Sequence, residues 1–375
     1  VYKRQDEDEA LSFHASLGDE ALTGLSPLGI KLSDENLDFM GNLSLAEVRK
    51  TEIREQYEMA SGKASLRQNY CNEAEYVFEN ESGSHIGIIF RVFDKGLAFR
   101  YRVENTRITS VEEELSGLEI SDLHRLWTIP FSSGDERIFK LSEGTGELQD
   151  QALSFPVLIE SGTGNWMLVT EADVSDYPLS SGRFEGDRLD YVFARDKEAV
   201  NEVEADFVSP WRVLMAGEDL SAIVENCMVD HLAPPAENGI ADWVEAGVTS
   251  FPWWGENTAN SHPEILKRYI DLSAKMGWRY IEFDVALINA PARAVEDWKS
   301  TPWIRDIVDY GAERGVLCYG WDEYSNLNTP EKRADIFGRY AELGIAGCKV
   351  DFVNSYSQNT RRVVEEIIRD AAKYK

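Results

Sequence analysis

Hydrophobic and polar residues alternate along most of the first 235 residues, which is the pattern of strands with one buried face. The two clearest runs, 84–93 and 97–103, flank Asp94-Lys95-Gly96 and predict a β-hairpin. Further strands are predicted at 51–59, 66–70, 75–79, 107–113, 126–131, 156–160, 166–170, 189–193 and 211–215, with a short helix at 219–228. So many short strands separated by turn signals favour a large β-sandwich.

The pattern changes near Pro234-Pro235, where strands begin to alternate with helices. Strands are predicted at 248–254, 279–285, 316–321 and 346–352, and the helices that follow them at 262–276, 302–314, 330–343 and 359–375. Gly277, Gly315 and Gly344 stand where helix C-caps are expected. Four serial βα units predict a parallel sheet, which belongs either to a (β/α)8 barrel or to a doubly wound sheet. We therefore expect two domains, over 6–235 and 236–375.

Composition narrows the classes of function. The 375 residues carry a net charge of −29, which argues against nucleic-acid or anionic-membrane partners. The chain has no run of 18 apolar residues, so membrane insertion is not expected. The four cysteines show no zinc-ligand spacing. Ten tryptophans suit a sugar-binding protein, although tryptophan is first of all a core residue.

Both ends of the chain have unusual sequences. The opening 1–5 reads like a translated sequencing adapter and is set aside from fold reasoning, and 371–375 stops inside a helical pattern. We therefore expect a gene fragment truncated at both ends, in which the lack of a leader peptide says nothing about location.

The strand at 346–352 ends with Lys349 and Asp351, two residues apart. Residues at this spacing project from the same face of a strand. A lysine beside a carboxylate lowers the pKa of that carboxylate and keeps it ionised, which suits a nucleophile. The alternative is an ordinary charged pair at a strand end.

In a (β/α)8 barrel the active site lies at the C-terminal ends of the strands. The residues at the four predicted ends are Trp253, Trp254, Asp284, Trp321, Lys349 and Asp351. Indoles can stack on sugar rings, and carboxylates can bind hydroxyls or attack an anomeric carbon, so this set describes a sugar site. Asp322 and Glu323 are expected in a solvated loop. The same expectation holds for Glu171 when the residues alone are considered.

Several segments resemble glycoside hydrolase family 97, and together they cover nearly the whole chain. They are Ser26-Pro27-Leu28-Gly29-Ile30, the hairpin from Arg91 to Arg102, Thr170-Glu171-Ala172-Asp173-Val174 with Tyr177-Pro178, Trp253-Trp254, and 344–352 with the sequence GIAGCKVDF. The first and second barrel strands depart from the family pattern at Phe251-Pro252 and at 285–287.

The resemblance implies an N-terminal β-supersandwich followed here by the first half of a (β/α)8 barrel, in a protein that is periplasmic or secreted. It implies hydrolysis of terminal α-glycosidic bonds, with α-galactosides favoured over α-glucosides. Asp351 matches the aspartate nucleophile that marks the family's retaining branch. The glutamate that acts as acid/base is expected beyond Lys375.

The resemblance also implies a bound calcium ion, held by several glutamates near the substrate. Glu171 matches the ligand that comes from the N-terminal domain, and the remaining protein ligands are expected beyond Lys375. This match turns Glu171 from a solvated loop residue into a candidate metal ligand.

The leading hypothesis is therefore a retaining α-glycosidase acting on an oligosaccharide or other α-glycoside. Asp351 is the nucleophile, Lys349 holds a hydroxyl and keeps Asp351 anionic, and Trp253, Trp254 and Trp321 shape the pocket, with Asp284 as a further sugar contact. The alternatives are a non-catalytic carbohydrate-binding protein on the same fold, an inactive gene fragment, and a metal- or phosphate-dependent barrel enzyme unrelated to sugars.

Overall fold

The computed structural model describes residues 2–5, 10–104, 109–132, 137–193, 202–203, 206–235, 244–284 and 301–374. The chain divides into two compact units. The first takes residues 1–235 and 355–361, and the second takes 236–354 and 362–375. No helix within the described ranges is both long and apolar enough to cross a bilayer.

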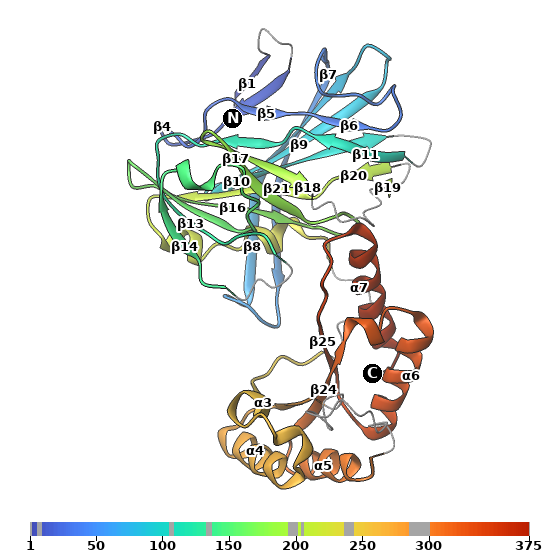
Figure 1. Cartoon of the computed structure of the whole chain (residues 1–375). Coiled ribbons are helices and arrows are strands. Elements are labelled where there is room, and N and C mark those ends of the chain that lie inside the picture. The colour runs from blue at the N-terminus through green and yellow to red at the C-terminus, as the bar shows by residue number, and fades with distance from the viewer. Residues whose placement is uncertain are drawn as a thin grey trace. The chain divides into compact units, whose positions relative to one another are not determined.

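A ten-stranded antiparallel sheet dominates the first unit (Figure 1). Its order is β14-β13-β15-β16-β21-β10-β9-β8-β7, with β20 paired to β10. The strands are β7 (Ser44–Glu58), β8 (Leu66–Glu79), β9 (His85–Phe93), β10 (Gly96–Glu104), β13 (Leu123–Thr128), β14 (Lys140–Glu143), β15 (Val157–Ser161), β16 (Trp166–Ala172), β20 (Asp206–Val208) and β21 (Trp211–Gly217).

Smaller sheets and short helices complete the first unit. The sheets are β1 (Tyr2–Gln5), β2 (Leu11–His14) and β5 (Ser26–Leu28); β19 (Glu202–Val203), β11 (Thr109–Glu114) and β6 (Ile30–Leu32); β12 (Gly117–Glu119), β18 (Arg188–Phe193) and β17 (Ser180–Glu185); and β3 (Ser16–Leu17) with β4 (Glu20–Ala21). The helices are the 3-10 helix η1 (Gly146–Leu148), α1 (Ser221–Val224) and α2 (Met228–Leu232).

Apolar side chains from both sets of sheets form the main core of the sandwich, which includes Phe13, Phe99 and Phe184. A second cluster lies on another part of the large sheet, where Trp211 and Met215 pack with Met228 of α2. The sandwich therefore follows from alternation, because most inward positions of the strands are apolar.

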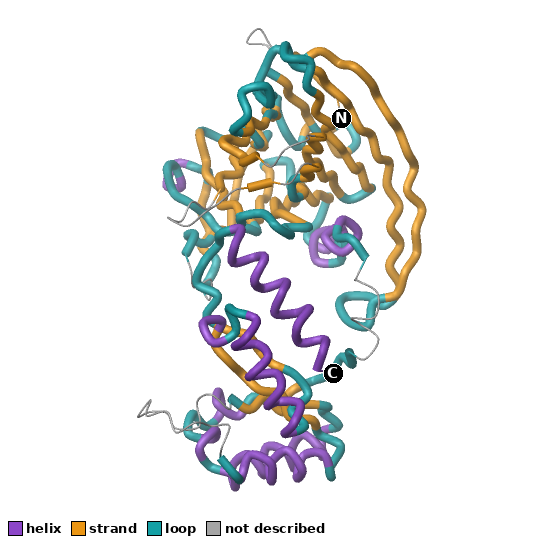
Figure 2. Tube along the Cα trace, turned by 90° about the vertical axis from the view of Figure 1, so that its right-hand side faces the viewer, coloured by secondary structure: helices purple, strands orange, loops and turns teal. Residues whose placement is uncertain are grey.

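The predicted hairpin is confirmed as β9 and β10, whose register runs from Phe93–Gly96 to Ile86–Val103. The predictions at 51–59, 66–70 and 75–79 were too short, because these residues form the two long strands β7 and β8, seen as a curved ribbon in Figure 2. Nearly every residue of β7 is exposed. Its sequence therefore carries no inside–outside pattern from which its length could be read.

Two further predictions for this unit differ from the structure. The helix predicted at 219–228 is two short helices, α1 and α2, because the segment between them leaves the helical conformation. The set-aside segment at the start of the chain forms β1, which pairs antiparallel with β2. Main-chain hydrogen bonding to an edge strand requires no particular side chains, so the composition of this segment did not indicate that it would form a strand.

The second unit is a four-stranded parallel sheet with helices against it. The strands follow one another in chain order as β22 (Thr249–Ser250), β23 (Tyr280–Phe283), β24 (Leu317–Glu323) and β25 (Cys348–Asp351). The helices are α3 (Pro252–Gly255), η2 (Ala259–Ser261), α4 (Pro263–Met276), α5 (Trp303–Ala312), η5 (Tyr324–Asn326), α6 (Pro330–Leu343), α7 (Gln358–Ala371) and η6 (Ala372–Tyr374).

The βα pattern thus gives the expected β plus α/β class. Gly277 and Gly344 are the left-handed C-caps of α4 and α6, as predicted, whereas α5 has Glu313 as its C-cap and the left-handed Gly315 follows two residues later. The described strands show no reversal of order, which a doubly wound sheet would require. Alternation points Ile281 and Cys318 into the core with the helices.

The strand predicted at 248–254 was wrong beyond Ser250. Pro252 occupies the first turn of α3, which carries both tryptophans, because proline has a helix-compatible φ and lacks an N–H for the ladder. The loop expected for Asp322 and Glu323 was also wrong, since both belong to β24 and Asp322 is buried.

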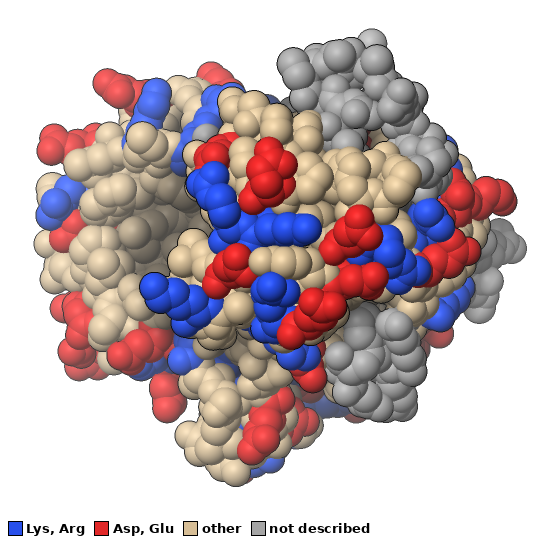
Figure 3. All heavy atoms as spheres, turned by 90° about the horizontal axis from the view of Figure 1, so that it is seen from below, with Lys and Arg blue, Asp and Glu red and all other residues tan. Residues whose placement is uncertain are grey.

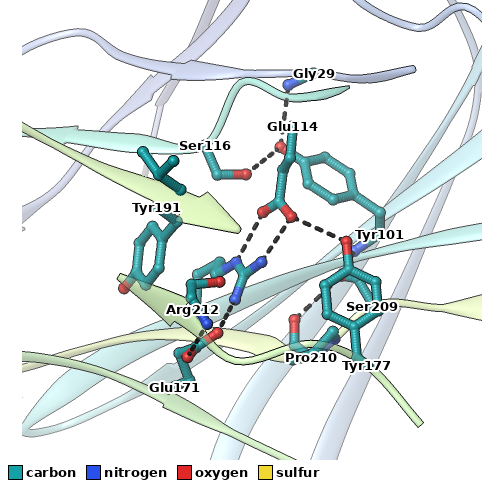
Figure 4. A network of polar contacts seen from close by, with 12 residues as sticks. Gly29, Tyr101, Glu114, Ser116, Glu171, Tyr177, Tyr191, Ser209, Pro210 and Arg212 are labelled. Atoms are coloured by element: carbon teal, nitrogen blue, oxygen red, sulfur yellow. Dashed lines mark hydrogen bonds and ion pairs between the residues drawn. The ribbon is translucent and has the colours of Figure 1, made fainter. Parts of the chain in front are cut away.

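A buried carboxylate–guanidinium–carboxylate triad lies in the first unit (Figure 4). Arg212 of β21 binds both oxygens of Glu114, with Nε–Oε1 and Nη2–Oε2 distances of 2.7 and 2.6 Å, and its Nη1 donates to Glu171. All three side chains are almost completely buried. Tyr177 donates to Glu114 at 3.3 Å, and the backbone N–H of Ser180 donates to Glu171 at 3.0 Å.

Burial disfavours the charged guanidinium, but the two carboxylates outweigh it and raise the pKa of Arg212 well above its ordinary value. The cation therefore stays charged in the core, and each carboxylate depends on it. Removing one partner of such a group leaves an uncompensated buried charge.

We predict that Arg212→Met lowers the free energy of unfolding by about 3–5 kcal/mol, because Glu114 and Glu171 lose their shared cation. Urea denaturation measures the change. The matched control is Arg54→Met, which removes an exposed arginine paired with Glu52 and should cost less than about 0.5 kcal/mol.

A triple variant separates the effect of the buried charges from the effect of lost packing. Adding Glu114→Gln and Glu171→Gln to Arg212→Met removes the uncompensated charges and should recover part of the loss. A triple variant no more stable than Arg212→Met would show that lost packing, not charge, causes the destabilisation.

Candidate active site

One face of the parallel sheet is polar. Alternation along β23, β24 and β25, continued one residue past β23, gives the side opposite Ile281 and Cys318 seven residues that we call the polar face: Glu282, Asp284, Tyr319, Trp321, Glu323, Lys349 and Asp351. Parallel register brings Tyr319 beside Glu282 and Lys349 beside Trp321. Three of the four strands thus contribute charged or hydrogen-bonding side chains to one surface.

Asp351 is held by several donors. The indole Nε1 of Trp321 donates to its Oδ2 at 3.0 Å, and the Lys349 Nζ lies 3.6 Å from the same oxygen. The backbone N–H of Phe352 donates to Oδ1 at 2.8 Å from a left-handed conformation with φ 53°. Partial burial raises the pKa of Asp351, but Trp321, the Phe352 N–H and Lys349 outweigh it and lower the pKa below its ordinary value. The carboxylate is therefore anionic and fixed in orientation.

Lys349 lies between two acids. Its Nζ is 3.4 Å from Oε1 of Glu282 and 3.6 Å from Oδ2 of Asp351. The ammonium also lies over the ring of Phe251, 4.9 Å from the centroid. The sequence prediction that Lys349 and Asp351 project together is confirmed by this geometry.

Asp284 and Glu282 are buried together, with exposed fractions of 2% and 5%. Asn260 donates to Asp284 Oδ2 at 3.3 Å, and Tyr319 donates to Glu282 Oε2 at 3.1 Å. Burial, followed by the charge of Glu282, raises the pKa of Asp284 to about 7. Buried, hydrogen-bonded groups of this kind favour the binding of polar ligands, because they are ordered before the ligand arrives.

Trp253 and Trp254 lie on α3, with exposed fractions of 41% and 80%. Both rings pack against Phe251, at centroid distances of 6.3 and 5.8 Å. Phe251 in turn contacts Lys349, so it links the exposed tryptophans to the polar face. Exposed indoles of this kind are available to stack on a sugar ring.

Glu171 lies in the first unit, and both its oxygens are engaged, one with Arg212 and the other with the Ser180 N–H. In the described parts of the chain, no group of three or more His, Cys, Asp or Glu is placed to hold a metal ion. Calcium takes six to eight oxygen ligands. The described residues therefore do not form a calcium site by themselves, and calcium binding stays a prediction.

Three site residues escaped the sequence analysis: Phe251, Glu282 and Tyr319. Glu282 and Tyr319 stand two positions before Asp284 and Trp321, so counting back by two from each predicted residue would have found both. Phe251 had no comparable signal, because it follows a two-residue strand.

The charge on the surface is mixed. Figure 3 shows Lys and Arg interspersed with Asp and Glu on the face that it presents, in a chain with 67 acidic and 38 basic residues. A continuous basic surface, as nucleic-acid binding requires, is not seen on this face.

Two family models match the chain. The model described as "Glycosyl-hydrolase 97 N-terminal" matches residues 1–235, and "Glycoside hydrolase 97" matches residues 243–375. A probable retaining alpha-galactosidase of Streptomyces bingchenggensis is 28% identical over 374 residues, which cover 96% of this chain and 56% of that protein. A retaining alpha-galactosidase of Bacteroides thetaiotaomicron is 22% identical and covers 94% of this chain and 58% of that protein.

Solved structures agree in fold. A beta-arabinopyranosidase superposes with a TM-score of 0.85 at 23% identity, over all of this chain and 63% of that one. A family 97 enzyme from Pseudoalteromonas sp. strain K8, in complex with acarbose, gives a TM-score of 0.85 at 19% identity, covering 99% and 63%. The chain thus spans less than two thirds of the length of these relatives. With both family models matching in order along nearly the whole sequence, it belongs to glycoside hydrolase family 97.

Proposed function

We propose that the full-length protein hydrolyses terminal α-glycosidic bonds with retention of configuration, with Asp351 as nucleophile. The observation that carries the proposal is the Asp351 carboxylate, which is anionic, oriented by Trp321 and the Phe352 N–H, and paired with Lys349. A retaining glycosidase needs such a carboxylate on one side of the anomeric carbon.

In the first step, an oxygen of Asp351 attacks the anomeric carbon while the glycosidic C–O bond breaks, and the leaving oxygen takes the electron pair and a proton from an acid. Water then hydrolyses the glycosyl ester and releases the sugar with the original configuration. The Trp321 and Phe352 donors restrict the carboxylate to one orientation, which reduces the entropy lost on reaching the transition state.

The ammonium of Lys349 serves as a second element of the site. It is near enough to Asp351 to hold the carboxylate anionic, and it can donate to a sugar hydroxyl at the same time. Asp284 is proposed as a further sugar contact, and Trp253, Trp254 and Trp321 as the aromatic walls of the pocket.

The substrate class is proposed to be α-galactosides rather than α-glucosides, with oligosaccharides as natural examples. The names of the two curated relatives, both retaining alpha-galactosidases, support this preference. Calcium binding through Glu171 and a periplasmic or secreted location remain proposals that rest on the family.

A non-catalytic carbohydrate-binding protein on the same fold is the second candidate. The exposed Trp254 suits it, since stacking alone can bind a sugar. It predicts sugar binding without turnover, and no effect of Asp351 substitutions beyond binding.

We predict that Asp351→Gly in the full-length gene product lowers turnover of an aryl α-galactoside by more than about a thousandfold, because the nucleophile is lost. Added azide should restore release of the aryl group and give the β-galactosyl azide, since azide attacks from the vacated side. Absorbance and NMR of the anomeric proton measure both.

The control is Glu313→Gln, an exposed residue at the end of α5 that should retain wild-type turnover. Wild-type-like turnover by Asp351→Gly would end the proposal. Loss of turnover without azide rescue would remove Asp351 from the nucleophile role.

We also predict that the wild-type kcat/KM for an aryl α-galactoside exceeds that for the matching α-glucoside by about tenfold or more, because a site that hydrogen-bonds one hydroxyl rejects its epimer. The β-L-arabinopyranoside, which has the ring configuration of an α-galactoside without the hydroxymethyl group, should react more slowly than the galactoside. Equal rates for galactoside and glucoside would contradict the preference.

A further inference from the structure

We propose that Glu282 and Asp284 form a positioning pair that shares one proton at neutral pH, and that the single negative charge left on the pair keeps Lys349 between Glu282 and Asp351. The inference rests on the proposed role of Asp351 as nucleophile. The pair acts on Asp351 through Lys349, and this role is separate from the sugar contact proposed for Asp284.

The charges on the polar face do not balance. Four carboxyl groups, Glu282, Asp284, Glu323 and Asp351, are accompanied by Lys349 as the single lysine or arginine within the described polar face, and Glu323 is partly exposed. Asp351 is partly exposed, so its charge is also hydrated. The excess therefore falls on the buried pair, where water cannot stabilise a second negative charge.

The geometry of the pair makes double ionisation costly. Residues two apart in extended backbone have their Cα atoms about 6.6 Å apart and project to the same face, and both of these side chains are buried there. Within the described residues, Asp284 Oδ1 has no hydrogen-bond partner although the side chain is nearly fully buried. Two like charges in one buried site hold a proton between them.

The donors around the pair indicate where the proton resides. Glu282 accepts a hydrogen bond from the Tyr319 hydroxyl and forms an ion pair with Lys349. Among the described residues, the Asn260 amide donates a hydrogen bond to Asp284. Burial and the Glu282 charge accordingly raise the pKa of Asp284, not lower it. The shared proton is therefore assigned to Asp284.

Other groups near the pair do not change this assignment. On the same face, β24 and β25 contribute the titratable groups of Tyr319, Glu323, Lys349 and Asp351, and the uncharged amide of Asn260 contacts Asp284 from η2. On the helix side lie Asp322, Tyr340 and Cys348, whose buried hydroxyl and thiol have raised pKa values and stay neutral.

The proton matters because it decides where Lys349 is drawn. With Asp284 neutral, Glu282 and Asp351 each offer one negative charge, and the ammonium lies between them. Once Asp284 ionises, the pair carries two negative charges and attracts Lys349 away from Asp351. Since the pKa of Asp284 is raised to about 7, the proton is present below that pH and lost above it, so Lys349 should leave Asp351 as pH rises through neutrality.

The first test measures kcat/KM against pH for the full-length protein. Asp284→Asn copies the protonated form, so its kcat/KM, whatever its value at pH 6, should not show the fall that wild type shows above about pH 7. Glu282→Gln removes the anchor of Lys349 and should lower kcat/KM about tenfold at every pH. Glu313→Gln should follow wild type. An Asp284→Asn profile with the wild-type alkaline midpoint would overturn the proposal.

The second test requires no turnover. Infrared difference spectra of the folded protein should show the C=O band of a protonated carboxyl that disappears around pH 7 and is missing in Asp284→Asn, but persists in Glu313→Gln. A protein without this band at pH 6 has no shared proton, whatever its activity. If Asp351→Gly proves active while the band is present, the nucleophile assignment fails and the proton pair remains.

Discussion

A single cation held between two carboxylates is the interaction on which both units depend. With 67 acidic and 38 basic residues, the chain has too few cations to pair each acid separately. Each cation that lies between two acids serves both, and the acids in turn fix its position. Three of these arrangements are Glu114–Arg212–Glu171 in the sandwich, Glu366–Arg333–Asp370 between α6 and α7, and Glu282–Lys349–Asp351 on the polar face.

These arrangements differ in how deeply the cation is buried, and burial decides what each one can do. Arg212 is fully enclosed, so its arrangement serves stability, and any change in it is felt by the whole sandwich. Lys349 is partly exposed and one of its acids is open to solvent. A ligand can therefore reach the arrangement around Lys349, and the same electrostatic pattern becomes available for chemistry.

Most of the fold could be predicted from the sequence, because period-two and βα patterns report which side of an element is buried. The helix over 330–343 and the hairpin around Gly96 follow directly from such patterns. β7 could not be sized, since neither of its faces is buried. The site was predicted in part: Asp351 and Lys349 were found from their spacing, whereas Glu282 was missed because a single glutamate inside a short strand resembles any other. Phe251 was missed because proline ends its strand.

The long strand β7 has one more consequence. It lies at the end of the ten-stranded sheet, and its outer main-chain N–H and C=O groups face solvent over most of fifteen residues. Such an edge strand can pair with a strand from another chain, and this pairing leads to edge-to-edge aggregation of sheets. The alternating Glu, Arg and Lys side chains along it oppose that stacking by charge and hydration. High salt, which screens these charges, weakens the protection without altering the fold.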